Sequence, residues 1–248
     1  MKIFISFVLI LTFNVYASED FEDSFENEFE QELVAEEKEG EVFDPLYGYN
    51  RVMTDFNDVV MINVFQPVID GYKYVVPRPA RKSIDNFFNN LYYPISLCNN
   101  LLQLKFKHSG NETLRFITNS TLGLLGLFDV ADEWFDIKPH KEDFGQTLGH
   151  YGVGSGFPIV IPFLGQSNLR DFGSLFVDAY ADPIYWYTSD IDDDMVSYGT
   201  YIGIRSFKLL NDYSLSEISY EDFTKDAIDL YPFIRDAYEQ NRNKLIGE

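Results

Sequence analysis

The sequence predicts an all-α fold built from short helices. Apolar residues recur at intervals of three and four along most of the chain after residue 44, which is the spacing of an amphipathic helix. Several of these segments begin near a Ser, Asn or Asp, whose side chains satisfy free amide groups in the first turn of a helix. Hydrophobic residues make up 46% of the chain and aromatic residues 17%, which excludes a chain that is disordered throughout.

The first 17 residues, MKIFISFVLILTFNVYA, are typical of a secretory signal peptide. Lys2 supplies the positive end, an apolar stretch follows from Ile3 to Phe13, and Ala17 is a small residue suited to cleavage. A membrane anchor is the weaker alternative, because the apolar stretch is too short to cross about 30 Å of hydrocarbon. We therefore expect export of the protein and cleavage after Ala17.

Residues 18–41 form an acidic arm with 12 carboxylates and one lysine. We expect this arm to be a disordered tether. Phe21, Phe25, Phe29 and Leu33 recur at every fourth position, so a short amphipathic helix that folds against a partner is the alternative. The whole chain carries a formal charge of -21, which excludes a nucleic-acid-binding protein because phosphate contacts need clustered Lys and Arg.

Cys98 is the only cysteine of the sequence. No disulfide can form within the chain, and no cysteine stands at the expected cleavage site to accept a lipid. The sequence predicts a free and buried thiol, since lone cysteines usually lie in the interior.

A helical domain is predicted over residues 42–248. Its first helix begins at Asp44-Pro45, where Asp can cap the first turn and Pro fits the first position, and its apolar positions continue to Val60. Pro67 and the VPRP stretch at 76–79 are expected to interrupt the helices. Further helices are predicted over residues 81–91, 94–106, 109–122, 128–135, 167–180, 195–211, 216–229 and 232–245.

Residues 145–166, GQTLGHYGVGSGFPIVIPFLGQ, differ from the rest of the domain. Six glycines and two prolines make a continuous helix improbable here. The segment 157–164 has no polar side chain and could form a buried strand. Two prolines weaken strand pairing and no other clear strand is available, so the strand is not the preferred interpretation.

The chain shows no recognisable catalytic motif. His140, Asp143 and His150 could together bind zinc, which would indicate a metal-dependent hydrolase, but hydrogen bonding within loops is the preferred explanation. The Gly-x-Gly-x-Gly at 152–156 lacks the helix that a phosphate-binding loop needs. Asp192–Asp194 is interpreted as a solvated loop, with calcium binding as an unspecific alternative. We predict no enzyme activity, no metal site and no cofactor.

Several motifs follow one another along the helical domain. They are DPLYGYNR at 44–51, DFND at 55–58, VPRPAR at 76–81, RF at 115–116, NSTLG at 119–123, FDVA at 128–131, DFGQTLGHYGVG at 143–154, PFLG at 162–165, LRD at 169–171, DP at 182–183 and YPFIRDAY at 231–238. With these motifs in this order, the sequence resembles the MlaA (VacJ) family of outer-membrane phospholipid-transport proteins.

The resemblance implies a fold, a location and partners. The fold would be a ring-like bundle of short amphipathic helices with an irregular Gly/Pro-rich segment, embedded in the periplasmic leaflet of the outer membrane and associated with a porin trimer. Such a protein is not an enzyme. It removes mislocalised phospholipids from the outer leaflet through an amphipathic channel and passes them to a periplasmic phospholipid carrier (MlaC-like), which maintains lipid asymmetry.

Within that frame, the Gly/Pro-rich segment supplies the candidate lipid path. We expect its apolar residues to form an apolar wall or a membrane-facing surface: Phe157, Ile159, Ile161, Phe163 and Leu164. Arg170 and Asp171 are interpreted as a structural pair, with contact to a lipid headgroup as the alternative.

One feature departs from the family. Its members are commonly lipoproteins, whereas this chain lacks the acceptor cysteine and carries the acidic arm. Attachment would then depend on an apolar rim and on contact with the porin. The alternative function is a soluble periplasmic lipid-binding or scaffold protein without a channel.

Overall fold

The structure is a computed structural model that describes residues 42–190 and 194–247. The predicted signal peptide at 1–17, the acidic arm at 18–41, and Asp192 and Asp193 lie outside the described residues. The described chain is helical apart from one small hairpin, which confirms the predicted all-α class. The elements are α3 Tyr47–Val60, η2 Met61–Phe65, α4 Gln66–Val75, α5 Arg78–Leu91, α6 Tyr93–Leu102, α7 Phe106–Thr121, α8 Val130–Phe135, α9 Phe144–His150, β1 Pro158–Ile161, β2 Gly165–Asn168, α10 Leu169–Ala181, α11 Pro183–Ser189, α12 Asp194–Leu215, α13 Tyr220–Thr224 and α14 Leu230–Gly247.

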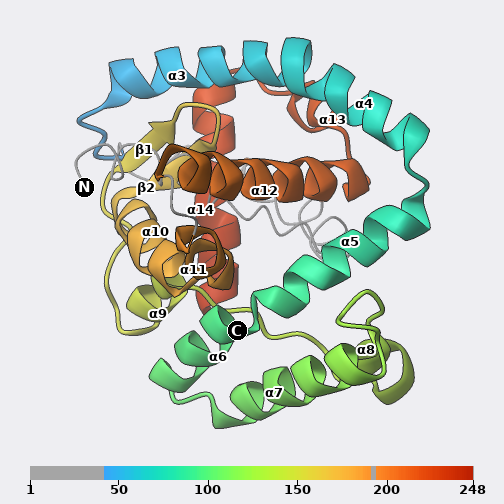
Figure 1. The fold of residues 1–248 in the computed structure, drawn as a ribbon. Coiled ribbons are helices and arrows are strands. Elements are labelled where there is room, and N and C mark those ends of the chain that lie inside the picture. Colours follow the sequence, from blue (N-terminus) through green and yellow to red (C-terminus); the bar gives the residue numbers. More distant parts are fainter. Residues whose placement is uncertain (1–41, 191–193, 248) are drawn as a thin grey trace.

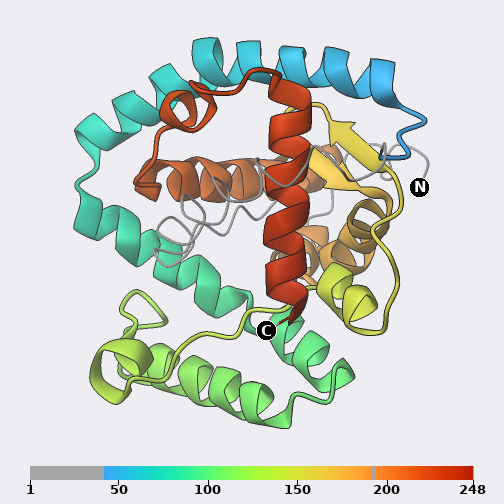
Figure 2. The ribbon, with the colours of Figure 1, turned by 180° about the vertical axis from the view of Figure 1, so that it is seen from behind.

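The helices form a ring. Figure 1 shows α3, α4 and α5 curving around the outside as an arch, with α6 and α7 continuing below them. Helix α12 crosses inside the arch, and α14 runs across the direction of α12 on the other side of the molecule, as the reverse view in Figure 2 shows. The interior of the ring is therefore bordered by segments that lie far apart in the sequence.

The arch begins with one uninterrupted helical rod made of α3, η2 and α4. The expected interruption at Pro67 is therefore wrong, whereas the one at the VPRP stretch is confirmed, because α4 ends before the extended Val76. The π-helical turn η2 directly precedes the proline, and the amide of Gln66 bonds to the carbonyl of Met61, five residues back. The wider turn lets the helix continue where a regular α-helix would place its carbonyls against the ring of Pro67.

The run 157–164 does form a strand, which corrects the sequence interpretation. Strand β1 pairs antiparallel with β2, and Pro158 lies opposite Asn168 at the end of the ladder. The prolines do not interrupt the strand pairing, because Pro158 is the first residue of β1 and Pro162 follows its last residue. The partner was missed because β2 is the polar segment GQSN, part of which had been assigned to a helix.

Helix boundaries differ from the sequence prediction in four places. Helix α9 forms inside the Gly-rich segment because Asp143 caps it, accepting a 2.8 Å hydrogen bond from the amide of Gln146. Helix α6 ends two residues before Leu104, whose backbone is left-handed. Helix α11 was not predicted, and of the helix expected over 216–229 only α13 forms, since Ser219 caps a new short helix. No helix was predicted over η2 and α4, and the remaining helices agree with the prediction to within a few residues.

The described interior holds more polar and charged side chains than hydrophobic ones. Helix α3 illustrates this, since it buries Asn50 and Thr54 and exposes Val52 and Val59. A soluble globular helix shows the opposite pattern. Cys98 is likewise exposed, which contradicts the prediction of a buried thiol, because α6 turns its polar face inward.

Candidate functional site

A cavity of about 650 Å³ lies inside the ring. Residues from η2, the hairpin and α12–α14 contribute apolar wall, and residues from α3, α5, α10 and α12 contribute polar and charged wall. Representative apolar lining residues are Met61, Phe65, Val160, Leu209 and Ile234. The cavity is therefore amphipathic.

The predicted wall residues of the Gly/Pro-rich segment take different positions. Phe163 and Leu164 line the cavity. Ile161 is buried without lining it, and Phe157 and Ile159 are half-buried outside it. Val160, which the sequence analysis did not single out, lines the cavity because alternate residues of a strand face opposite sides.

Helix α3 holds the hairpin turn in place. The side-chain amide of Asn57 donates to the carbonyl of Ile161 at 3.0 Å and accepts from the amide of Phe163 at 2.7 Å. The ring of Phe163 packs edge-on against Phe56 at 5.2 Å between centroids. Phe163 has a φ of 66°, a left-handed conformation that a bulky residue adopts only when its surroundings hold it there. The hairpin is thus fixed at the cavity wall by polar contacts from α3.

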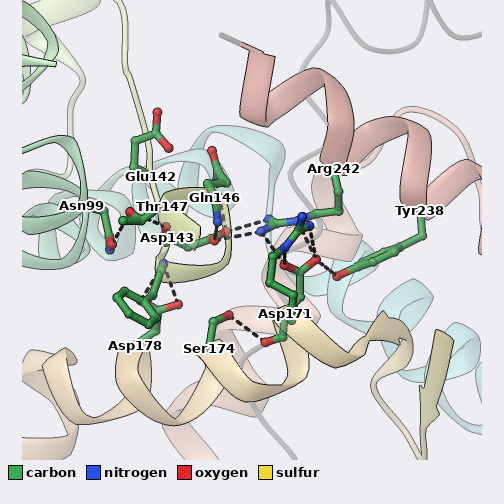
Figure 3. A network of polar contacts seen from close by, with 12 residues as sticks. Asn99, Glu142, Asp143, Gln146, Thr147, Asp171, Ser174, Asp178, Tyr238 and Arg242 are labelled. Atoms are coloured by element: carbon green, nitrogen blue, oxygen red, sulfur yellow. Dashed lines mark hydrogen bonds and ion pairs between the residues drawn. The ribbon is translucent and has the colours of Figure 1, made fainter. Parts of the chain in front are cut away.

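A charged network joins α9, α10 and α14, as Figure 3 shows, and it lies at one wall of the cavity, which Asp143, Asp171 and Arg242 line. We call Asp143, Arg170, Asp171 and Arg242 the arginine network. Arg242 binds Asp143 through two hydrogen bonds of 2.7 and 2.8 Å. It reaches Asp171 with a further bond of 3.2 Å, while its Nε lies 2.9 Å from the same carboxylate without the alignment of a hydrogen bond. Tyr238 donates to Asp171 at 2.8 Å.

Arg170 and Asp171 form an ion pair with 2.8 Å between Nε and Oδ1, and both side chains are buried. Asp171 and Arg242 line the cavity, whereas Arg170 does not. Two arginines therefore face two carboxylates in the arginine network, and the charges balance. Sequence analysis singled out one ion pair of the network but did not identify Arg242, which lies 71 residues further along the chain than Asp171.

Close approach of the helices makes this network possible. A Cβ placed on Gly145 of α9 would lie 2.7 Å from Nη2 of Arg242 and closer still to Oδ1 of Asp171. A larger residue here would displace the carboxylate and guanidinium groups that join the three helices.

Asp143 of the network and the neighbouring Asp178 have pKa values shifted in opposite directions. Burial raises the pKa of Asp143, but the Arg242 guanidinium and hydrogen bonds outweigh it and hold the pKa at about 2. Burial and the negative charge of Asp143 raise the pKa of Asp178 to about 8. Asp178 lines the cavity, accepts hydrogen bonds from the amide of Phe144 and has no ion pair with a described residue.

The residues considered for zinc are not brought together. The ring of His140 stacks on His108 with centroids 3.8 Å apart, Asp143 is engaged by Arg242, and the exposed His150 packs against Tyr151. Among the residues that the structure describes, no three His, Cys, Asp or Glu side chains are placed to hold a metal ion.

The outer surface of the ring is rich in exposed apolar side chains. They lie along α3, η2 and α4 and again along α6, α7, α8 and the loop between the last two. Examples are Val59, Val64, Leu102, Leu114, Ile117 and Trp134. None of the described helices is long and apolar enough to cross a membrane.

The loop after α7 presents its leucines to solvent in a strained conformation. Leu124 and Leu125 are 62% and 72% exposed, and their φ angles of 51° and 60° are left-handed. A residue other than Gly, Asn or Asp rarely adopts this conformation, which costs about 1–3 kcal/mol.

Comparison with known proteins agrees with this architecture. Residues 42–245 match the family described as the MlaA lipoprotein. The intermembrane phospholipid transport system lipoprotein MlaA of Escherichia coli strain K12 is 34% identical over 205 residues, which are 81% of this chain and 77% of that protein. Uncharacterized protein RP093 of Rickettsia prowazekii is 31% identical over 208 residues, 83% of this chain and 79% of that protein.

A solved structure reported as "Structural basis for maintenance of bacterial outer membrane lipid asymmetry" is similar in fold. The TM-score is 0.64 at 33% sequence identity, over 82% of this chain and 99% of that chain. The family match and the sequence identity to its curated members show that this chain belongs to the MlaA lipoprotein family.

Proposed function

We propose that this protein is the outer-membrane component of a phospholipid transport system that maintains lipid asymmetry. In this proposal it sits in the periplasmic leaflet, takes up phospholipids misplaced in the outer leaflet through its central cavity, and passes them to a periplasmic carrier. It acts as a transport component, not as an enzyme. The observation that carries the proposal is an amphipathic cavity enclosed by a ring whose outer face is apolar.

The exposed apolar rim supports a position within one leaflet. A ring of short helices satisfies its backbone hydrogen bonds internally and can therefore lie in hydrocarbon without spanning it. Burial of its polar faces and exposure of its apolar faces is the arrangement that a lipid environment favours. Trp186 and Tyr187, both exposed on α11, are residues typical of the boundary between lipid and water.

The cavity walls support a phospholipid as cargo. The polar wall suits a headgroup, and the apolar wall, which includes Phe163 and Leu164, suits acyl chains. Phe157, Ile159 and Ile161 do not line the cavity, so their proposed role is confined to the membrane-facing side of the hairpin. Arg170 and Asp171 are proposed to be a structural pair, since Arg170 does not reach the cavity and Asp171 is held by Arg170, Arg242 and Tyr238.

Attachment to the membrane is proposed to depend on the rim and on a porin trimer. The relative from Escherichia coli is named a lipoprotein, but the only cysteine of this sequence is Cys98, inside α6. The strained leucine loop is the part of the rim best suited to enter lipid. Replacement of both Leu124 and Leu125 by Asp should release protein from membranes into a carbonate wash, measured by quantifying washed and retained fractions. The soluble alternative predicts full release of the unmodified protein.

Transport through the cavity is tested by measuring phospholipid in the outer leaflet of cells that lack this protein and any second copy of it. We expect exposed phospholipid to rise on deletion and to return to normal when the full-length gene is restored. Leu209→Trp, which fills part of the cavity, should fail to restore it. Leu210→Trp is the matched control, because the neighbouring leucine is equally half-buried on α12 but does not line the cavity.

Two outcomes contradict the proposal in different ways. No rise on deletion would show that the protein does not maintain asymmetry. Full activity of a folded Leu209→Trp variant would show that lipid does not pass through this cavity. Failure of both tryptophan variants would be attributed to folding, and thermal unfolding of each purified variant decides that point.

A further inference from the structure

The cavity has a second charged wall, which we call the basic wall. It consists of Lys82 on α5, Lys141 in the loop before α9, and Arg205 and Lys208 on α12, all of which line the cavity. Helices α5 and α12 pack against each other, so residues from distant parts of the sequence share this wall. None of these four residues was singled out from the sequence.

The basic wall carries more positive than negative charge. Two acids of the same region, Asp85 and Asp212, also line the cavity, and Asp182 lies behind Arg205, so four cations face three carboxylates there. Asp212 pairs with Lys208, one turn away on α12. Arg205 pairs at 2.9 Å with Asp182, which does not line the cavity. The excess is notable in a chain with a formal charge of -21.

Two of the cations are deeply buried. Arg205 and Lys208 are each 6% exposed, and the Nε of Arg205 is a buried donor with no acceptor among the described residues. A buried N–H without an acceptor costs roughly 1–3 kcal/mol. The structure therefore retains an unsatisfied donor and excess positive charge beside a cavity that is large enough to hold a ligand.

Lys82 is the accessible member of the wall. It lies one turn before Asp85 on the same face of α5 and makes no ion pair with a described residue. Lys82 thus presents to the cavity an ammonium group that is not held in an ion pair.

We infer that the basic wall is a subsite for the phosphate diester of a phospholipid headgroup, with Lys82 and Lys208 as its principal contacts. This inference rests on the proposed function and specifies which wall receives the headgroup. Phosphate accepts charge-assisted hydrogen bonds from ammonium and guanidinium groups, which are about twice as strong as neutral ones. A diester in this place would balance the excess charge and offer an acceptor near Arg205, while the acyl chains would lie against the apolar wall.

The ionisation of the neighbouring groups agrees with an anionic ligand. Burial, together with the positive charge of Lys208, lowers the pKa of Lys141. Burial raises the pKa of Asp212. Both shifts reflect charged groups held away from water, and a bound anion would stabilise the protonated lysine.

The test compares a fluorescent phosphatidylglycerol with a diacylglycerol that carries the same chains but no phosphate. Binding of each to the purified full chain in detergent is titrated. We expect the phospholipid to bind at least tenfold more tightly, and Lys82→Gln to reduce phospholipid affinity three- to tenfold without changing diacylglycerol affinity. Lys225→Gln is the control, because Lys225 is exposed and does not line the cavity.

A second variant examines the buried part of the wall. Replacing Lys208 alone would leave Asp212 without its partner, so both are changed to Leu. Replacing a whole buried ion pair by apolar residues is often neutral for stability. We expect the double variant to fold and to lose phospholipid affinity by a similar factor.

Inorganic phosphate is used as a competitor to separate the two sources of the anion. Weak competition at millimolar concentration supports a headgroup site, because the free ion lacks the acyl chains. If inorganic phosphate binds more tightly than the lipid, the wall is a free-phosphate site and the inference is wrong. Equal affinity for phospholipid and diacylglycerol also overturns it but leaves lipid transport intact, whereas failure of both lipids to bind contradicts the proposed function itself.

Discussion

Two charged clusters border the cavity, and they differ in the balance of positive and negative groups. In the arginine network, Arg242 and Arg170 face Asp143 and Asp171, and each guanidinium lies against a carboxylate. In the basic wall, four cations face three carboxylates, including Asp182 behind Arg205. A balanced network holds helices together, because removal of any member leaves one buried charge in excess. An unbalanced one is stable only in contact with water or with a ligand of opposite charge.

This comparison predicts that loss of one charge should affect stability in the first cluster and binding in the second. Buried pairs are expensive to break, whereas an accessible cation can be removed at little cost. The following experiments examine that difference, beginning with the largest expected effect.

Replacement of Arg242 by Met should lower the free energy of unfolding by about 3–5 kcal/mol, because it leaves the carboxylates of Asp143 and Asp171 buried without their shared cation. Denaturant unfolding in detergent measures the change. Lys82→Gln is the matched loss of one positive charge from the other cluster and should change the same quantity by less than about 0.5 kcal/mol. If the free energy of unfolding fell by a similar amount in both variants, the two clusters would not differ in their contribution to stability.

Gly145→Ala should destabilise the protein by about 1–3 kcal/mol, because the added Cβ would collide with Arg242 and Asp171. Thermal unfolding measures the effect. The control is Gly173→Ala on α10, where no atom lies within 4 Å of an added Cβ and alanine favours the helix. A stable Gly145→Ala protein would mean that the helices can separate without loss of the network.

Asp178→Asn should change how stability depends on pH. The pKa of Asp178 is about 8 in the folded chain against an ordinary value of 3.8, so between about pH 4 and 8 the folded protein keeps a proton that the unfolded chain has lost. The contribution of Asp178 to the free energy of unfolding therefore falls as pH rises through that window, by up to about 1.4 kcal/mol per pH unit. The asparagine variant lacks this dependence and can still accept from the amide of Phe144.

Measurement of the free energy of unfolding from pH 5 to 8 checks the prediction. Relative to the unchanged protein, the asparagine variant should gain stability as the pH rises. Parallel curves for the two proteins would show that Asp178 does not hold its proton, and that the acidic side of the cavity is charged at neutral pH.

Local signals explain which parts of the fold could be predicted. Asp129 and Asn168 cap α8 and α10 with their own side chains, and helical spacing extends through both segments, so the information lies within a few residues. The Gly/Pro-rich segment was harder because its decisive contacts are distant. Asn57 holds the hairpin turn from 106 residues away, and no local pattern reveals that partner.

The candidate site shows the same division. The apolar wall was partly foreseen, because Phe163 and Leu164 belong to a run without polar side chains. The sequence does not indicate the basic wall, since Lys82, Arg205 and Lys208 are isolated basic residues that resemble ordinary surface charges. Only packing of α5 against α12 brings them to one wall.

The sequence by itself determined the all-α class, the order of most helices and membership of the family, because spacing, capping residues and motifs are local properties. Tertiary structure alone decided which face of each helix turns inward. Amphipathic spacing distinguishes a polar and an apolar face of a helix but does not say which of them is buried. In this structure, α3 buries Asn50 and Thr54, while Val52 and Val59 face outward. That choice creates the polar cavity and the apolar rim, because the free energy of burial depends on the surroundings that the assembled ring provides.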